Sequence, residues 1–298
     1  MPRMQRGLPV KRGVPACKRV VVVSSGKGGV GKSSVSVNLA LALAALPGRP
    51  RIGLLDLDIF GPSIPKLMGL EGVGEPLLTS AIRSILEDNR LTPLRSHGIP
   101  CMSMGFLLPN SPSGSNNADT PVVWRGMMVM KAVQQLLFDV DWKAGGGGAG
   151  DLDVLVIDTP PGTGDVALSL GQLVHVDGAV IVSTPQDVAI LDTRKGIAMF
   201  RKLAIPLIGA VLNMSHFIAP GTTTPHPIFG SPIAFRETCK ELGLEVLAEV
   251  EISPTVSRRG DQGWPAVMMG DEEDEAIPRV RKEFSELAAK VWKSLESK

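Results

Sequence analysis

The sequence predicts an α/β fold: a doubly wound, mostly parallel sheet of about seven strands with helices on both faces. Short runs rich in Val, Ile and Leu recur along the chain, and such runs are typical of strands buried on both faces. Longer helical stretches lie between several of these runs, as the connections of parallel strands require. Several runs also end in Asp, Ser or Asn, at the edge where open α/β sheets bind ligands.

The length of 298 residues suits one large domain or two small ones, and a hydrophobic content of 44% supplies an ample core. We expect a single domain over residues 19–298, preceded by a basic lead-in at residues 1–18. Flexible insertions are expected near 109–120, which is polar, and near 144–150, which is rich in glycine.

The charge balance excludes some functions. A net charge of +1 argues against extensive nucleic-acid binding. Because no apolar run reaches 18 residues, we predict no transmembrane segment. The first 19 residues carry six Lys or Arg, and no acidic residue precedes Asp56. Such a start resembles an organelle-targeting segment, so an organelle is one expected location. A solvated basic tail on a cytoplasmic protein is the alternative.

Three cysteines, Cys17, Cys101 and Cys239, lie far apart and form no C-x-x-C pair. Their spacing indicates a reducing compartment and predicts no metal site. We interpret them as small apolar residues of the core.

The first predicted strand, Arg19–Val23, is followed by a stretch, residues 26–33, that fits the phosphate-loop pattern G-x-x-x-x-G-K-[ST]. The Ala/Leu-rich helix predicted over Ser34–Leu46 comes next, so strand, loop and helix occur in the order that a phosphate loop needs. A glycine turn without a ligand is the alternative. The residues expected to hold the phosphates of ATP are Gly26, Lys27, Gly28, Gly29, Val30, Gly31, Lys32, Ser33 and Ser34.

Within this loop, Lys32 is expected to reach the terminal phosphates as a catalytic residue, and Ser33 to ligate Mg²⁺. The second predicted strand, Arg51–Asp56, delivers Asp58 to the ligand edge. There Asp58 is expected to orient the attacking water and to assist Mg²⁺. A carboxylate that caps a short helix is the other interpretation of Asp58.

Asp158 ends the strand predicted over Leu152–Ile157 and occupies the position of a Walker-B magnesium ligand. The glycines and prolines of residues 159–165 predict a hinge that senses the γ-phosphate.

The rest of the chain supplies the remaining elements of the predicted fold. Further strands are predicted at Ile99–Phe106, Gly178–Ser183, Leu207–Asn213 and 244–250. Helices are predicted near Met127–Leu137, from Asp187 to about Lys202, and at the C-terminus. The polar face of the C-terminal helix mixes both charges, which favours docking on the domain over membrane binding.

Three motifs resemble one class of ATPases. Lys27, placed beside the first glycine, resembles the deviant phosphate loop of the SIMIBI class, which includes the Min and Par ATPases and the Mrp-type iron–sulfur carriers. Gly61-Pro62-Ser63 after Asp58 resembles switch I of the Mrp-type proteins, and the block Asp158–Asp165 is characteristic of them. Within that group the chain most resembles the mitochondrial type that assists iron–sulfur delivery to respiratory complex I, as Met102–Phe106 and Val122–Gly126 illustrate.

This resemblance implies a homodimer in which Lys27 crosses to the nucleotide of the second copy. The resemblance also implies hydrolysis of ATP. The adenine base is expected to be recognised by Asn213, and the backbone at Pro254 is expected to pass beside the base. No N-K-x-D element for guanine occurs in the sequence, which favours ATP over GTP. The implied partners are iron–sulfur client proteins, with complex I subunits as the expected clients. The resemblance to the mitochondrial type also implies the mitochondrial matrix as the location.

One departure concerns the iron–sulfur cluster. The family follows its Asn-Met-Ser with C-P-x-C, whose two thiolates hold a [4Fe–4S] cluster that bridges the dimer, but Ala219 and Thr222 stand at those positions here. Neither side chain supplies the thiolate that a cluster needs. Two hypotheses follow: an ATP-dependent assembly factor that binds a cluster with other ligands, or a cluster-free, ATP-driven dimerisation switch or chaperone.

Overall fold

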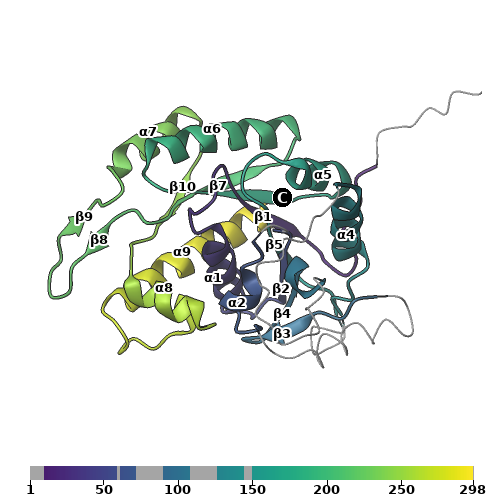
Figure 1. Cartoon of the computed structure of the whole chain (residues 1–298), viewed down its shortest axis with the longest axis horizontal. Coiled ribbons are helices and arrows are strands. Elements are labelled where there is room, and N and C mark those ends of the chain that lie inside the picture. The colour runs from purple at the N-terminus through teal and green to yellow at the C-terminus, as the bar shows by residue number, and fades with distance from the viewer. Residues whose placement is uncertain (1–9, 59–60, 72–89, 108–125, 144–149, 298) are drawn as a thin grey trace, which may run out of the picture.

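A computed structural model describes residues 10–58, 61–71, 90–107, 126–143 and 150–297. In this part of the chain, one eight-stranded sheet forms the centre of the molecule (Figure 1). All neighbouring strands pair in parallel except β3, which is antiparallel at one edge. The strand order is β10 (Val246–Glu249), β7 (Leu207–Leu212), β6 (Gly178–Ser183), β1 (Val20–Ser25), β5 (Val154–Asp158), β2 (Ile52–Asp56), β4 (Ile99–Ser103) and β3 (Leu94–Ser96).

The central strand β1 shows why helices cover both faces of the sheet. Successive side chains of a strand point to opposite faces. Val20 and Val22 accordingly enter one buried cluster, and Val21 and Val23 enter another. The first cluster includes residues of α4 (Gly126–Phe138), α5 (Asp165–Leu173), α6 (Asp187–Lys202) and α7 (Pro232–Glu241). The second includes residues of α1 (Lys32–Ala44), α2 (Ile64–Leu67) and α9 (Ala276–Glu296). The predicted doubly wound fold is confirmed.

The chain leaves β1 for strands on one side of it, returns to pair β5 with β1, and then continues through β6 on the other side. This reversal is a topological switch point, where a crevice opens outside the carboxyl ends of the strands. The loop after β1 therefore lies where a ligand is expected to bind.

Several elements differ from the sequence-based expectation. The strand expected over Ile99–Phe106 ends at Ser103, and the 3-10 helix η1 (Met104–Leu107) follows it. A small second sheet, β8 (Phe217–Ile218) with β9 (Pro225–His226), was not predicted, because strands of two residues are too short for a periodicity. Helix α8 (Pro254–Asp261) was not predicted either; Ser253 caps it by accepting a hydrogen bond from the Val256 amide. The 3-10 helix η3 (Ala266–Met268) joins α8 to α9.

Part of the basic lead-in packs against the domain. Arg12 pairs with the end of α5 through backbone hydrogen bonds to Leu173 and His175, and its guanidinium lies 3.5 Å from the centre of the Phe138 ring. Val14 is buried. The two expected insertions lie almost entirely outside the described residues, as do residues 122–125 of the motif Val122–Gly126. Among the described residues, no helix has the length and apolar character to cross a membrane.

Candidate nucleotide-binding site

The loop after β1 is shaped by close packing at two of its glycines. A Cβ at Gly26 would overlap the backbone of Asp192 in α6, so only glycine lets the loop approach that helix. Gly31 has a positive φ of 78° and lies against the Asn213 side chain, where any Cβ would also collide. The rim of the loop, residues 27–29, is exposed. The predicted loop therefore follows a buried strand and opens directly into α1.

Below the loop, a buried lysine bridges two strands. The Lys32 side chain is 6% exposed, and its Nζ lies 2.8 Å from Asp158 Oδ2 and 4.0 Å from Asp58 Oδ2. The hydroxyl of Ser33 donates to the same Asp158 oxygen at 2.6 Å. The predicted catalytic lysine and the predicted magnesium ligands are thus brought together at the carboxyl edge. A cation among carboxylates is positioned to exchange these partners for phosphate oxygens.

Asp158 is fully buried and accepts from several donors. Its Oδ1 accepts from the Ser36 hydroxyl at 2.6 Å, while its Oδ2 is held by Lys32 and Ser33. Burying a carboxylate is costly unless it is paired and hydrogen-bonded, and these contacts meet that requirement. Ser36 was missed in the sequence because it lies beyond the loop motif, although it is a polar residue between two valines of the helix.

Asp56 lies beside Asp158, because the two are register partners on β2 and β5. Its oxygens accept from the Asp58 amide at 2.9 Å and from the Ser103 hydroxyl at 2.9 Å. Burial, with the neighbouring charge of Asp158, raises the pKa of Asp56 to about 7. This carboxyl group therefore anchors the turn that carries Asp58, and its own oxygens face protein donors.

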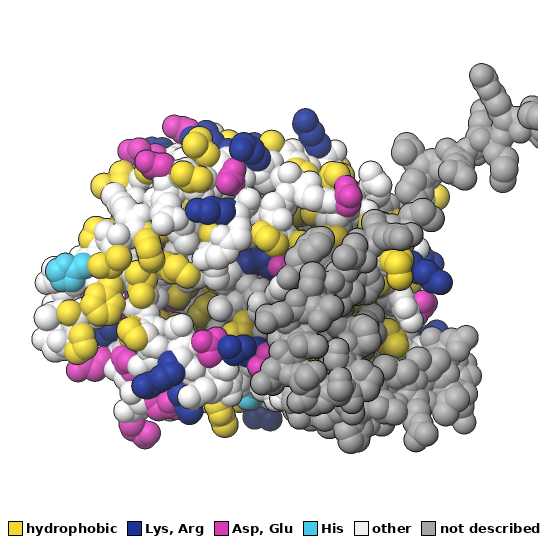
Figure 2. Space-filling view, in the orientation of Figure 1, with side chains coloured by type: hydrophobic (Ala, Val, Ile, Leu, Met, Phe, Trp, Pro, Cys, Tyr) yellow, Lys and Arg dark blue, Asp and Glu magenta, His cyan; other side chains and the backbone are white. Residues whose placement is uncertain are grey.

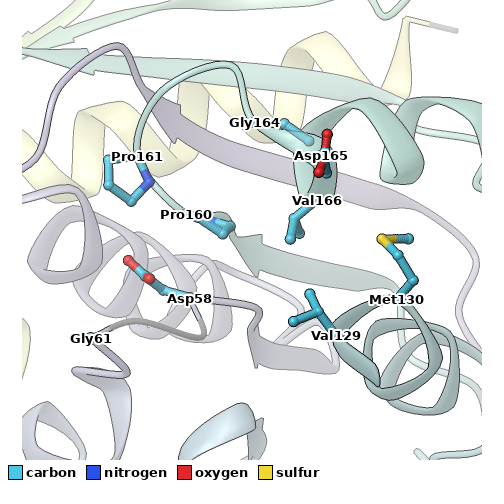
Figure 3. A pocket seen from close by; sticks show the side chains of 10 residues that line it. Asp58, Gly61, Val129, Met130, Pro160, Pro161, Gly164, Asp165 and Val166 are labelled. Carbon is cyan, nitrogen blue, oxygen red and sulfur yellow. The ribbon is translucent and has the colours of Figure 1, made fainter. Parts of the chain in front are cut away.

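The predicted hinge, residues 159–165, is tied to β1 at one end and exposed at the other. Thr159 donates through its amide and its hydroxyl to the Val23 carbonyl, both at 3.1 Å, and the Gly162 amide donates to the Ser25 carbonyl at 2.7 Å. Residues 163–165 are exposed. Asp58, Pro160 and Pro161 line a cavity of about 470 Å³ together with Val129, Met130 and Val166. Figure 3 shows Asp58 on the side of this cavity nearest to Pro160 and Pro161. Asp58 and the hinge residues Pro160 and Pro161 therefore border the same cavity.

Two adjoining cavities extend from the loop. One, of about 590 Å³, is lined by the loop residues, Asp58 and Lys66 and has the position of a phosphate cleft. The other, of about 330 Å³, is lined by Ser34, Asn213 and the start of α8, on either side of Pro254. The side-chain amide of Asn213 donates through Nδ2 to the Val30 carbonyl at 2.8 Å, so the wall of this second cavity is bonded to the loop. The two cavities adjoin at the loop, because Gly31 and Ser34 line both of them.

The segment expected to hold cluster ligands forms the turn between β8 and β9. Both the amide and the hydroxyl of Thr222 donate to the Ala219 carbonyl, at 3.0 and 2.8 Å. Figure 2 shows hydrophobic side chains gathered beside the β8–β9 pair. Ile228 and Phe229, which follow β9, are exposed. In the described part of the chain, no three His, Cys, Asp or Glu side chains are grouped to hold a metal. The turn is thus closed by the Thr222 side chain, at a position where the sequence resemblance implied a cysteine ligand.

We expect the native thiols to react slowly. Burial is the main cause that raises the pKa of Cys17 and of Cys101 to about 12, and that of Cys239 to about 11. A raised thiol pKa keeps the protonated form, so the reactive thiolate is scarce at pH 8. A chromogenic disulfide reagent at pH 8 should label the folded chain slowly and all three cysteines promptly in denaturant. Immediate labelling of a folded-state thiol would contradict this assignment.

A glycine loop between the central strand and a helix, with Lys32 and Asp158 beneath it, defines the class of P-loop NTPases. Residues 16–292 match the family described as ParA: NUBPL iron-transfer P-loop NTPase, and the chain belongs to this family.

The curated relatives agree with this assignment. The chain is 45% identical over 294 residues to the iron-sulfur cluster transfer protein NUBPL of Mus musculus, an alignment that covers 99% of this chain and 83% of the relative. It is 41% identical over 279 residues, 94% of this chain and 79% of the relative, to the iron-sulfur protein required for NADH dehydrogenase, mitochondrial, of Arabidopsis thaliana. The resemblance inferred from the motifs is confirmed.

Solved structures agree as well. A nucleotide-binding protein of Archaeoglobus fulgidus in complex with ADP superposes with a TM-score of 0.66 at 30% identity and covers 89% of this chain and 93% of its own. The cell division ATPase MinD of Pyrococcus furiosus superposes with a TM-score of 0.58 at 20% identity, covering 92% of this chain and 98% of its own; it shares the fold.

Proposed function

We propose that this chain binds and hydrolyses ATP as a homodimer and serves in the assembly or transfer of iron–sulfur clusters. The observation that carries the ATPase is the buried contact of Lys32 and Ser33 with Asp158, directly under the glycine loop. The names of the relatives support the iron–sulfur role, and complex I subunits are the proposed clients. The proposed location is the mitochondrial matrix, with the cytoplasm as the alternative.

The residues present fit a magnesium ion bound with the nucleotide. Mg²⁺ needs few protein ligands when phosphates and waters complete its shell. The Ser33 hydroxyl, Asp158 and Asp58 are the proposed ligands, since all three lie within the same buried cluster around Lys32. When bound, the ion would neutralise charge that develops on the transferred phosphoryl group.

The chain's own groups supply the remaining chemistry. Lys32 exchanges its carboxylate contacts for the terminal phosphates, and Asp58 orients the attacking water. Exposed Lys27 reaches the nucleotide of the second copy. Loss of the γ-phosphate then relaxes the hinge at 159–165, which weakens the dimer.

The second cavity is the proposed site of the nucleoside. Asn213 lies on its wall, and Ser253 and Val256, on either side of Pro254, form another side. We therefore propose that Asn213 recognises adenine and that the chain passes the base at Pro254. The absence of N-K-x-D from the sequence supports ATP over GTP.

The residues at the β8–β9 turn do not fit a [4Fe–4S] cluster. Cluster iron binds thiolate, and Ala219 and Thr222 offer an alkyl group and a hydroxyl. The three cysteines lie on separate elements, and burial keeps their thiols protonated. These observations favour a second candidate function, a cluster-free, ATP-driven switch or chaperone that acts on a client without carrying the cluster at this turn.

Anaerobic reconstitution with iron and sulfide separates the two functions. The wild-type chain is expected to take up little iron, whereas Ala219→Cys with Thr222→Cys is expected to gain iron and visible absorbance, because two thiolates per chain are restored. The double variant Ala219→Ser with Thr222→Ser is the matched control, as it differs only in the ligating atom. Stoichiometric iron and sulfide in the wild-type chain would contradict the cluster-free switch and support a carrier with other ligands.

A further inference from the structure

Ser36 lies on α1, three residues after the proposed magnesium ligand Ser33. Residues three apart on a helix share a face, so the hydroxyls of both point toward β5 and bracket Asp158. Ser36 Oγ is 2.6 Å from Asp158 Oδ1 and 3.0 Å from the Lys32 carbonyl oxygen. Ser36 is fully buried, so no solvent-exposed position is open to its hydroxyl.

The Ser36 hydroxyl has one proton and two possible acceptors, the Lys32 carbonyl oxygen and Asp158 Oδ1. A charged carboxylate is a stronger acceptor than a backbone carbonyl, and it is also the nearer one here. The Ser36 proton is therefore donated to Asp158. Each oxygen of the Asp158 carboxylate then has its own donors, Ser36 on Oδ1 and Ser33 with Lys32 on Oδ2.

This division of donors fixes the orientation of Asp158. Without the Ser36 hydroxyl, the buried Oδ1 would lose the donor that holds it, and the carboxylate would gain by rotating so that Oδ1 also approaches the Lys32 ammonium. Such a rotation would turn Oδ2 away from Ser33. We propose that Ser36 is a positioning residue, which holds the Asp158 carboxylate in the orientation that Mg²⁺–nucleotide binding needs. This inference rests on the proposed ATPase function.

A purely structural role makes a different prediction. A helical serine often bonds the carbonyl four residues earlier, and its loss then affects only helix stability. Ser285 in α9 provides the matched control, because its hydroxyl donates to the Arg281 carbonyl at 2.9 Å. Ser285→Ala thus removes the same kind of helix contact at a distance from the site.

The test measures the affinity for ATP by calorimetry with Mg²⁺ and again with a chelator. The ratio of the two dissociation constants reports the contribution of the metal, whatever the stability of the variant. Ser36→Ala is expected to reduce this ratio about 10-fold, as loss of a partner that orients a metal ligand typically does. Ser285→Ala should leave the ratio unchanged. Ser36→Cys, with similar size and a weak donor, should reduce the ratio in the same direction and serves if Ser36→Ala does not fold.

The experiment distinguishes failure of the proposed function from failure of the positioning role of Ser36. If the wild-type chain binds no ATP, the proposed function is wrong. If the wild-type chain binds ATP in a magnesium-dependent way and the foldable Ser36 variants keep its ratio, the positioning role is overturned and Ser36 is a structural residue only.

Discussion

Lys32→Ala is expected to lower the affinity for ATP by about 100-fold or more, since truncating one partner of a buried charge pair costs roughly 3 kcal/mol. The Lys32 ammonium lies between Asp158 and Asp58 and is shielded from water. Its removal leaves two carboxylates facing the triphosphate. The variant therefore loses an attraction and gains a repulsion.

The measurement for Lys32→Ala is equilibrium binding of a fluorescent ATP analogue, accompanied by thermal unfolding. Lys282→Ala is a matched control, because it removes a lysine from an exposed i,i+4 pair with Glu286. The control should bind like the wild type. A folded Lys32→Ala chain that binds ATP within about 3-fold of the wild type, well below the effect of a lost buried charge, would remove Lys32 from the site.

Lys27→Ala is expected to leave ATP binding almost unchanged and to lower the rate of hydrolysis by about 1,000-fold or more, the scale of a cationic group supplied in trans. The side chain is exposed on the rim of the loop, so its removal should cost little stability. Its proposed contribution arises only when a second copy closes over the nucleotide. Phosphate release under saturating ATP measures this effect.

Mixing two inactive variants tests whether Lys27 acts across the dimer. Asp58→Asn should bind ATP but orient water poorly. In a mixed dimer with Lys27→Ala, one site combines an intact Asp58 with a Lys27 from the other copy. Hydrolysis should therefore return on mixing. A mixture as slow as either variant alone would contradict the crossing of Lys27.

The fold was predictable where local sequence and burial agree. The run Val20–Val23 is apolar at every position because β1 is covered on both faces, and the loop after it needs glycines where α6 and Asn213 approach closely. Asp158 was predictable because it ends a strand that is as apolar as β1. In each case the signal lies within a few residues of the feature.

The remaining features depend on contacts between distant segments. Ser36 matters through Asp158, more than 100 residues away, so its spacing from the loop gave no sign of its partner. The packing of Arg12 on Phe138 is equally remote, and its charge alone indicated a targeting segment or a solvated tail. The short pair β8–β9 is set by its turn, which hydrogen bonds of Thr222 close. The sequence showed that the cysteines are missing there, but not what shape the turn takes.

Titration calorimetry of the wild-type chain with ATP under saturating Mg²⁺ tests the central claim most directly. If residues 26–33 grip the triphosphate, the titration should give a clear heat of binding with one ATP per chain, and Lys32→Ala should abolish it. A properly folded wild-type chain that produces no heat of nucleotide binding would contradict the account.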